Sequence, residues 1–164
     1  MIFVTTGTQA SFDRLIKAID EIANQLTGEL IYAQVLETEY SVKSDNMKLI
    51  GFLSQGEFEN YYSNARLIVS HAGTGSIFSA LTSNKPIIVL PRRASLGEHR
   101  NEHQMATAKK FKDIGLLEVA FDENELKTKI LECLKELKPL NQKTIGKYAS
   151  DSFILNLKSK ISAH

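Results

Sequence analysis

The sequence contains a single cysteine, Cys133, among its 164 residues. One thiol cannot form an internal disulfide and supplies no multi-cysteine metal site, so we expect a reducing, cytoplasmic environment. No apolar run is long enough to span a bilayer, and the amino-terminal run has no basic lead and is too short for a signal peptide. We therefore expect any membrane association to come through a partner or to be superficial.

A strong excess of charge of one sign is also missing. Twenty basic and nineteen acidic residues leave a formal net charge of +1. Proteins that bind nucleic acid or membranes by electrostatics carry a clear basic excess, so we expect no nucleic-acid partner. The chain also lacks internal repeats, low-complexity segments and an interdomain linker, and its length predicts a single domain over 1–164.

Short apolar runs alternate with segments of helical periodicity along the chain. The runs expected to be strands are 2–5, 30–35, 48–53, 67–70, 86–90 and 116–120. The segments expected to be helices are 12–26, a stretch through 58–62, 74–83, 101–112 and 123–137. This alternation predicts an α/β fold with a Rossmann-like, doubly wound parallel sheet, whose ligands bind beyond the carboxyl ends of the strands.

Two segments stand outside this alternation. Residues 37–46 are polar and predict a loop, with one extended stretch at 40–42. After a link at 139–146, residues from about 147 to 164 predict a last amphipathic helix with an apolar stripe. That stripe either packs onto the domain or docks a partner.

A glycine-rich turn with the sequence SHAGTGS, residues 70–76, connects a predicted strand with a predicted helix. Glycine lets the backbone approach a ligand closely, and the free N–H groups and positive dipole at a helix start attract phosphate. A second such neighbourhood, Gly7-Thr8-Gln9, follows the first strand at the same edge of the sheet. The two turns predict a diphosphate site, and the alternative is a tight turn with incidental glycines.

Two common nucleotide motifs are absent. Gly73-Thr74-Gly75 begins like G-x-G-x-x-G, but Phe78 stands where the third glycine belongs, and no acidic residue ends a second strand about twenty residues further on. No G-x-x-x-x-G-K-[ST] run occurs. The sequence therefore excludes the usual dinucleotide-binding fingerprint and an ATP-hydrolysing P-loop.

Polar side chains crowd the segment that follows the fifth predicted strand. Arg92 and Arg93 are candidates to pair with phosphate oxygens, and Glu98, Asn101 or Gln104 are candidates to hydrogen-bond sugar hydroxyls. The alternative for this segment is a solvated helix start with capping carboxylates.

The same segment contains His99, Glu102 and His103 in the order of the H-x-x-E-H zinc-hydrolase pattern. Such a site needs a further carboxylate ligand and a large cleft, whereas this pattern straddles a predicted loop and helix start. A zinc hydrolase is thus the least favoured hypothesis, and we expect no metal.

His71 ends the central strand just before the glycines. It is the one candidate catalytic residue, as a group that polarises a phosphate or sugar hydroxyl or acts as a general acid or base. The alternative is that His71 only fixes the loop by hydrogen bonding.

The turn at 70–76, the strand at 86–91 and the run at 97–104 together resemble the nucleotide-sugar-binding half of family 28 glycosyltransferases. The resemblance covers nearly the whole chain. It is closer to the split members of that family, in which the donor-binding half is a separate soluble subunit. These include the dolichol-linked N-acetylglucosaminyltransferase and bacterial exopolysaccharide enzymes.

The resemblance implies half of a GT-B fold, with the diphosphate of a UDP-sugar at the glycine-rich turn. It implies that residues 71–76 line the phosphates, that Asn101, His103 and Gln104 approach the sugar, and that Glu98 and His99 belong to an extended form of the motif. With the two turns and Arg92, the candidate donor-binding residues are Gly7, Thr8, His71, Ala72, Gly73, Thr74, Gly75, Ser76, Arg92, Glu98, His99, Asn101, His103 and Gln104.

The resemblance also implies an inverting hexosyl or N-acetylhexosaminyl transfer without a metal cofactor. The partner would be a membrane-anchored subunit that binds a lipid-linked acceptor for surface-polysaccharide assembly, and activity would require it. A non-catalytic helper subunit is the alternative. One position departs from the pattern, because Ser79 stands where larger relatives place a glutamate for the ribose hydroxyls.

Overall fold

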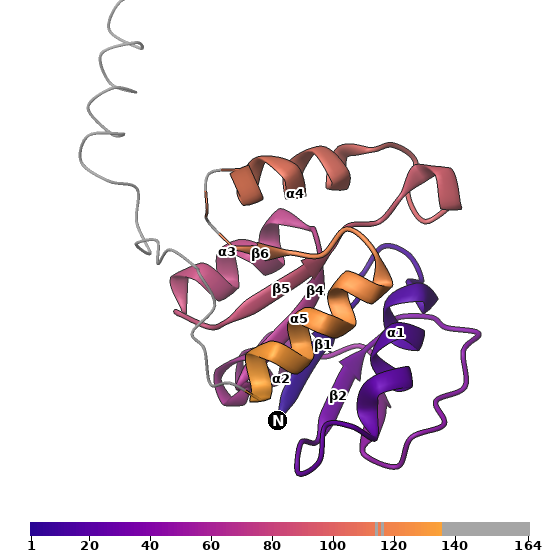
Figure 1. Ribbon diagram of the computed structural model, residues 1–164, viewed down its shortest axis with the longest axis vertical. Coiled ribbons are helices and arrows are strands. Elements are labelled where there is room, and N and C mark those ends of the chain that lie inside the picture. The colour runs from indigo at the N-terminus through magenta and orange to yellow at the C-terminus, as the bar shows by residue number, and fades with distance from the viewer. Residues whose placement is uncertain (114, 116, 136–164) are drawn as a thin grey trace, which may run out of the picture.

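A computed structural model of the chain describes residues 1–113, 115 and 117–135 (Figure 1). Within these residues, six parallel strands form one sheet in the order β3-β2-β1-β4-β5-β6. The strands are β1 (Ile2–Thr5), β2 (Ile31–Gln34), β3 (Met47–Ile50), β4 (Leu67–His71), β5 (Ile87–Leu90) and β6 (Glu118–Val119). The predicted doubly wound parallel sheet is confirmed.

Helices cover both faces of the sheet. They are α1 (Asp13–Ala23), α2 (Gln55–Asn64), α3 (Thr74–Thr82), α4 (His103–Asp113) and α5 (Glu123–Lys135), with a short 3₁₀ helix, η1 (Ala94–Leu96). The buried residues divide into two clusters, one with α1 and α5 and the other with α2, α3 and α4. The sheet therefore lies between two helical layers.

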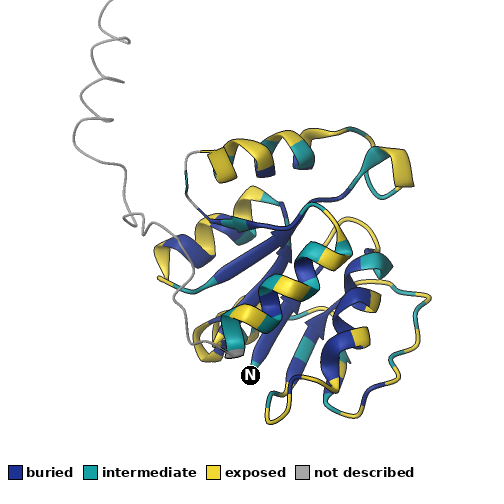
Figure 2. Cartoon of the chain, in the orientation of Figure 1, coloured by how far each residue is buried: buried dark blue, intermediate teal, exposed yellow. Residues whose placement is uncertain are grey.

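Burial on both faces explains why the central strands are almost continuously apolar. In β1, Ile2 and Val4 pack toward α1 and α5, while Phe3 packs toward the opposite layer. The Phe3 ring lies 5.6 Å from the ring centroids of Phe58 and Tyr61 in α2. Figure 2 shows the strands as the most completely buried part of the chain.

The connection from β2 to β3 has no helix and no strand. Two carboxylates of α1 hold it instead: Asp13 accepts from Thr38 Oγ1 at 2.5 Å, and Asp20 accepts from Tyr40 Oη at 2.8 Å and from Ser44 N at 3.0 Å. No strand forms at 40–42, the stretch expected to be extended, because the loop hydrogen-bonds α1 rather than a strand.

Element ends differ modestly from the predicted ranges. The third strand stops at Ile50, the last strand is confined to Glu118–Val119, and α4 begins at His103, two residues later than expected. The expected helix at 147–164 lies outside the described residues. Among the described helices, none is both long and apolar enough to cross a membrane.

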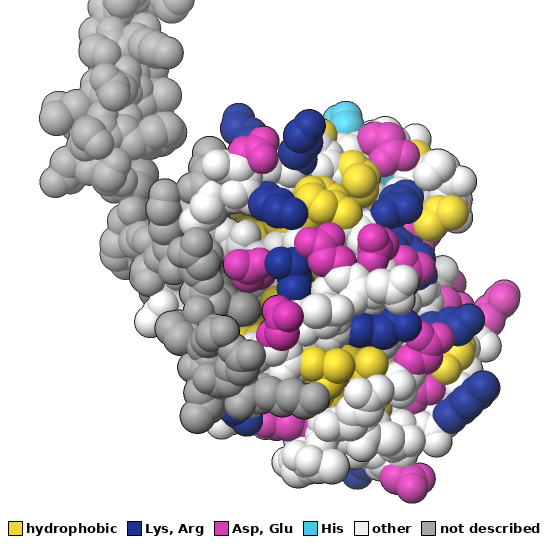
Figure 3. Space-filling view, in the orientation of Figure 1, with side chains coloured by type: hydrophobic (Ala, Val, Ile, Leu, Met, Phe, Trp, Pro, Cys, Tyr) yellow, Lys and Arg dark blue, Asp and Glu magenta, His cyan; other side chains and the backbone are white. Residues whose placement is uncertain are grey.

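Figure 3 shows Lys and Arg side chains interspersed with Asp and Glu on the face that carries α1 and α5. Ion pairs join these two helices, Lys127 with Glu21 and Arg14 with Glu123. This mixed surface agrees with the near-zero net charge.

The order of the strands fixes where a ligand can bind. The chain runs outward from β1 through β2 to β3, and then returns to β4 on the other side of β1. The loops after β1 and β4 therefore diverge at the carboxyl edge of the sheet, which is the usual binding crevice of such folds.

Candidate functional site

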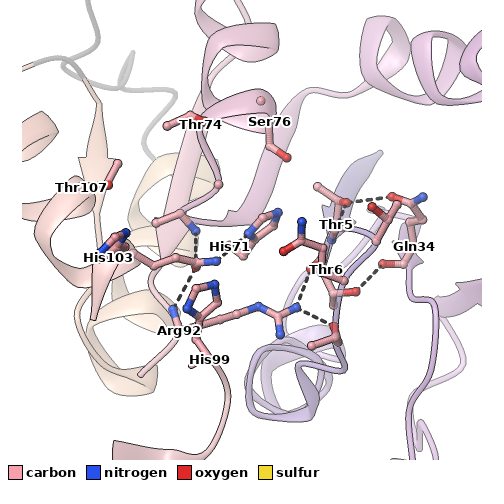
Figure 4. Close-up of a pocket in the computed structure, with 18 of the residues that line it drawn as sticks. Thr5, Thr6, Gln34, His71, Thr74, Ser76, Arg92, His99, His103 and Thr107 are labelled. Carbon is pink, nitrogen blue, oxygen red and sulfur yellow. Dashed lines mark hydrogen bonds between the residues drawn. The ribbon is translucent and has the colours of Figure 1, made fainter. Parts of the chain in front are cut away.

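A cavity of about 660 Å³ lies at this divergence, over the carboxyl ends of β1 and β4 (Figure 4). Its walls come from the ends of β1 and β2, from the loops after β1, β3, β4 and β5, and from the amino-terminal parts of α2, α3 and α4. The candidate donor-binding residues that line it are Gly7, Thr8, His71, Ala72, Gly73, Thr74, Gly75, Ser76, Arg92, His99, His103 and Gln104.

The amino terminus of α3 opens into the cavity. Gly73 is the N-cap in an extended conformation, and the first intrahelical bond runs from Ile77 N to Gly73 O at 3.2 Å. The preceding N–H groups of Thr74, Gly75 and Ser76 have no acceptor within the helix. The first turn carries no acidic residue. This turn is therefore suited to bind an anion.

Two of the glycines are needed for the imidazole of His71. A Cβ atom on Gly73 would lie 2.2 Å from His71 Cε1, and one on Gly7 would lie 2.6 Å from His71 Nε2. Gly7 also has a φ of +77°. Gly75 differs, because a Cβ there would meet no atom within 4 Å. Gly7 and Gly73 thus make room for the ring, whereas the space beside Gly75 is open.

Gln104 connects His71 with the ends of two strands. Its Oε1 accepts from the backbone N–H groups of Ala72 and Arg92, each at 3.2 Å, and its Nε2 lies 3.2 Å from His71 Nδ1. Burial of His71, together with the nearby charge of Arg92, lowers the pKa of the imidazole to about 4. His71 is therefore neutral at pH 7.

Arg92 holds the loop after β1. Its guanidinium donates to the carbonyl oxygens of Thr6, Ala10, Ser11 and Glu98, at 2.7, 2.6, 2.7 and 3.2 Å. We call this arrangement the Arg92 clamp. Arg92 is only 2% exposed. The expected pairing of Arg92 with phosphate oxygens is corrected accordingly, because its donors are directed at these carbonyl groups.

Phe12 lies between two cations beside the clamp. The guanidinium carbon of Arg92 is 4.8 Å from the centroid of its ring, and that of Arg14 is 5.2 Å away. The buried ring thus packs the start of α1 against the loop after β5.

Glu98 does not reach the cavity. Its carboxylate forms a two-point ion pair with Arg14 and accepts from Arg93 N at 2.9 Å. Asn101 is not among the lining residues either, and its Oδ1 accepts from His103 N at 3.2 Å at the start of α4. The sugar contacts expected of Glu98 and Asn101 therefore stay a prediction, because in this structure both side chains hold the loop after β5 and neither lines the cavity.

The H-x-x-E-H pattern does not form a metal site here. His99 lies before α4 begins, and the Glu102 carboxylate accepts from the N–H groups of Ala94 and Ser95 in η1. Among the described residues no three His, Cys, Asp or Glu side chains are grouped to hold a metal ion. The zinc-hydrolase hypothesis therefore has no ligand set in the described part of the chain.

Thr5, Thr6 and Gln34 were not among the candidate residues, yet they form a polar cluster with Gly7 at the ends of β1 and β2. Thr5 Oγ1 donates to Gln34 Oε1 at 2.8 Å, Thr6 Oγ1 donates to Gln34 O at 3.2 Å, and Gly7 N donates to Thr5 Oγ1 at 3.2 Å. All four residues line the cavity. The available sequence signal was that Thr5 and Gln34 are polar residues at the carboxyl ends of predicted strands, where a ligand binds in this fold.

Other lining residues carried no clear signal in the sequence. Leu53 and Phe58, from the segment after β3, give the cavity an apolar side, and Thr107 of α4 lies one turn beyond His103. Ser79 is exposed on α3 and is not among the lining residues. The structure thus places no α3 carboxylate at the cavity.

Comparison with known proteins gives consistent results. The sequence model of the glycosyltransferase family 28 C-terminal domain matches residues 1–153. The UDP-N-acetylglucosamine transferase subunit ALG13 of Eremothecium gossypii is 37% identical over 97 residues, which are 57% of this chain and 46% of that protein. The protein of the same name from Saccharomyces cerevisiae is 33% identical over 78 residues, 47% of this chain and 37% of that protein. The chain thus spans less than half the length of these curated relatives.

Solved structures share the fold. The solution structure of ALG13 aligns with a TM-score of 0.59 at 21% identity, covering 95% of this chain and 93% of that one. Acinetobacter baumannii MurG aligns with a TM-score of 0.67 at 16% identity, over 98% of this chain and 49% of that one. At these identities the likeness shows the fold alone.

Proposed function

The chain belongs to the glycosyltransferase family 28 C-terminal domain family, and we propose that it is the donor-binding subunit of a two-component, inverting glycosyltransferase. The donor is a UDP-sugar, with UDP-N-acetylglucosamine as the first one to test because two relatives are named as transferase subunits for that sugar. The acceptor is a lipid-linked saccharide of a surface polysaccharide.

The observation that carries the proposal is the meeting of the α3 amino terminus with His71 in one cavity at the divergence of β1 and β4. The first-turn N–H groups and the helix dipole provide positive potential for a diphosphate. A departing nucleoside diphosphate gains negative charge during transfer, so the same groups stabilise it in the transition state.

The two sides of the cavity suit the two ends of a nucleotide sugar. Leu53 and Phe58, on the β3 side, offer an apolar surface for a base. His99, His103 and Thr107, on the α4 side, offer polar groups for sugar hydroxyls. The diphosphate then lies between them, over the start of α3.

We propose that transfer requires no bound metal, since α3 and His71 supply the donors that stabilise the leaving group. A second, membrane-anchored subunit binds the acceptor and keeps this chain at the inner face of the membrane. The catalytic base, where one is used, belongs to that subunit or to the acceptor side of the complex.

Isothermal titration of the full chain with UDP and with a panel of UDP-sugars tests the proposal. Weak binding of UDP that survives chelation of divalent cations is expected. Sugar transfer should appear only when membranes containing the partner are added. Transfer by the purified chain alone would contradict the two-component model, and absence of UDP binding would contradict the donor role. Unchanged turnover after replacement of His71, with the complex intact, would favour a helper subunit instead.

A further inference from the structure

The orientation of the Gln104 amide is fixed by groups that can only donate. Its buried oxygen faces two backbone N–H groups, those of Ala72 and Arg92, each at 3.2 Å. In the flipped orientation the amide NH₂ would face both donors, and two N–H groups would lose their acceptor. The oxygen therefore faces the strand ends, and the NH₂ group faces His71.

This orientation determines where the His71 proton lies. Gln104 Nε2 is 3.2 Å from His71 Nδ1, and because the amide nitrogen donates, Nδ1 must accept. A neutral imidazole carries one proton, so that proton is on Nε2. Hydrogen bonds thus connect the backbone N–H of Arg92, after β5, through the Gln104 amide to the imidazole of His71 at the end of β4. They set which nitrogen of that ring carries the proton.

The protonated nitrogen is the one beside the ligand-binding turns. His71 Nε2 lies next to Gly7, where an added Cβ atom would be 2.6 Å away, and Gly7 lines the same cavity. In Figure 4, the His71 ring faces the loop that carries Thr5 and Thr6. The slot between Gly7 and Gly73 holds the ring in this position.

We propose that Gln104 is a positioning residue that makes His71 an obligate hydrogen-bond donor to an anionic oxygen through Nε2–H, so that His71 is not the catalytic base. Naming that oxygen as part of a diphosphate rests on the proposed function, whereas the tautomer does not. Nδ1 is engaged by Gln104 and Nε2 already holds a proton, so the neutral ring has no free lone pair in the cavity with which to take another.

Burial and the surrounding charges keep the ring neutral. Burial is the main cause of the lowered pKa of His71, and the guanidinium of Arg92 and the imidazole of His99, both from the segment after β5, further disfavour a second proton. His103 of α4 faces the same cavity, and the first turn of α3 carries no acidic residue. A neutral donor keeps its proton across the physiological pH range, so its contribution to binding an anion does not titrate there.

The first test reads the tautomer of the free wild-type chain by ¹⁵N NMR of its histidine rings. The His71 signals are assigned by their loss in His71→Asn. An acceptor-type Nδ1 and a protonated Nε2 are expected at pH 7. A protonated Nδ1 would overturn the proposal, and neither result depends on whether UDP binds.

The second test changes the partner of Nδ1. Gln104→Glu keeps the shape and one oxygen toward the strand ends but faces Nδ1 with a carboxylate oxygen, which draws the proton to Nδ1. UDP affinity should then fall about tenfold or more at high pH, where Nε2 is bare, and recover at lower pH as the ring becomes doubly protonated. The wild-type chain should lack this pH profile.

Gln9→Glu is the matched control, because it adds the same charge to the same cavity from the exposed loop after β1. It should leave the His71 nitrogen signals unchanged. A Gln104→Glu chain whose His71 signals match wild type would overturn the proposal. The proposal would also be overturned if Gln104→Glu moved the His71 proton to Nδ1 and yet bound UDP as tightly as Gln9→Glu at every pH. If wild type has the proton on His71 Nε2 but the chain never binds UDP, the role of Gln104 in setting the tautomer stands. Only the proposed function is then rejected.

Discussion

Arg14 and Glu98 lie 84 residues apart in the sequence, yet they form a two-point ion pair, with Nε to Oε1 at 2.6 Å and Nη2 to Oε2 at 2.8 Å. Each side chain is only 12% exposed. Arg14 also donates to Pro91 O at 2.9 Å. The pair therefore ties the start of α1 to the segment that follows β5, beside the candidate site.

Loss of this pair should loosen that segment. We expect Arg14→Met to lower the free energy of unfolding by about 2 kcal/mol, because it leaves the Glu98 carboxylate without its cation. Urea denaturation measures the change. Lys17→Met, at an exposed position of the same helix, is the control and should stay within about 0.5 kcal/mol of wild type. Equal effects of the two changes would mean that the ion pair contributes nothing.

The slot around His71 predicts that a side chain at position 73 would clash with the imidazole, and that removing the imidazole would relieve the clash. Gly73→Ala should cost about 1–3 kcal/mol, because its Cβ atom would lie 2.2 Å from His71 Cε1. The double variant Gly73→Ala with His71→Ala should recover part of this loss, measured as a double-mutant cycle by thermal denaturation. Gly56→Ala, where a Cβ meets open space, serves as the control. Strict additivity in the cycle would rule out the clash.

Burial of His71 makes stability depend on pH. Its pKa in the folded chain is about 4, below the ordinary value of 6.5, so the unfolded chain binds more protons between these two values. The contribution of His71 is therefore fully present above pH 6.5 and is lost as the pH falls toward 4, by up to about 3 kcal/mol. Urea midpoints across this range should fall more steeply for wild type than for His71→Asn. Parallel curves would show that His71 titrates normally.

Asp20 should control the loop between β2 and β3. Burial alone would raise its pKa, but hydrogen bonds from Ser44, Lys43 and Tyr40 outweigh it and lower the pKa below 3.8. The stabilisation is thus present above pH 3.8 and is lost as the pH falls through the folded pKa.

We expect Asp20→Asn to cost about 2 kcal/mol at pH 7 and to speed proteolysis within 36–46, because the amide turns donors toward donors. The exposed Asp45→Asn is the control for removing a negative charge from this region. Equal cleavage rates for the two variants would contradict a holding role of Asp20. The hydrogen bond that Tyr40 donates to Asp20 raises the pKa of the Tyr40 phenol to about 12. This phenol should therefore stay protonated in alkali that ionises a free tyrosine.

The parts of the fold visible in the sequence were those set by local patterning. Apolar runs such as 67–70 and 86–90 marked strands buried on two faces, and the glycines at 73 and 75 marked the turn into α3. Because parallel strands share one carboxyl edge, placing the site followed from the alternation of strands and helices.

What the sequence could not show were pairings between distant residues. Glu98 looked like a free acceptor for a sugar, and only the fold reveals that Arg14 occupies it. Gln104 looked like a ligand group, yet its oxygen accepts from two strand ends. The contact of Gln34 with Thr5 was hidden as well, because nothing near Gln34 in sequence shows that β2 lies next to β1.

In the Arg92 clamp, the guanidinium donates to backbone carbonyl oxygens rather than to side chains. A carbonyl group is present whatever residue stands at the position, so replacing Thr8, Gln9 or Ala10 by most other types removes none of the four acceptors. The backbone conformation of the loop after β1 therefore does not depend on which side chains the loop carries. One wall of the cavity can therefore change its side chains to suit another ligand, while the backbone that presents them stays in place.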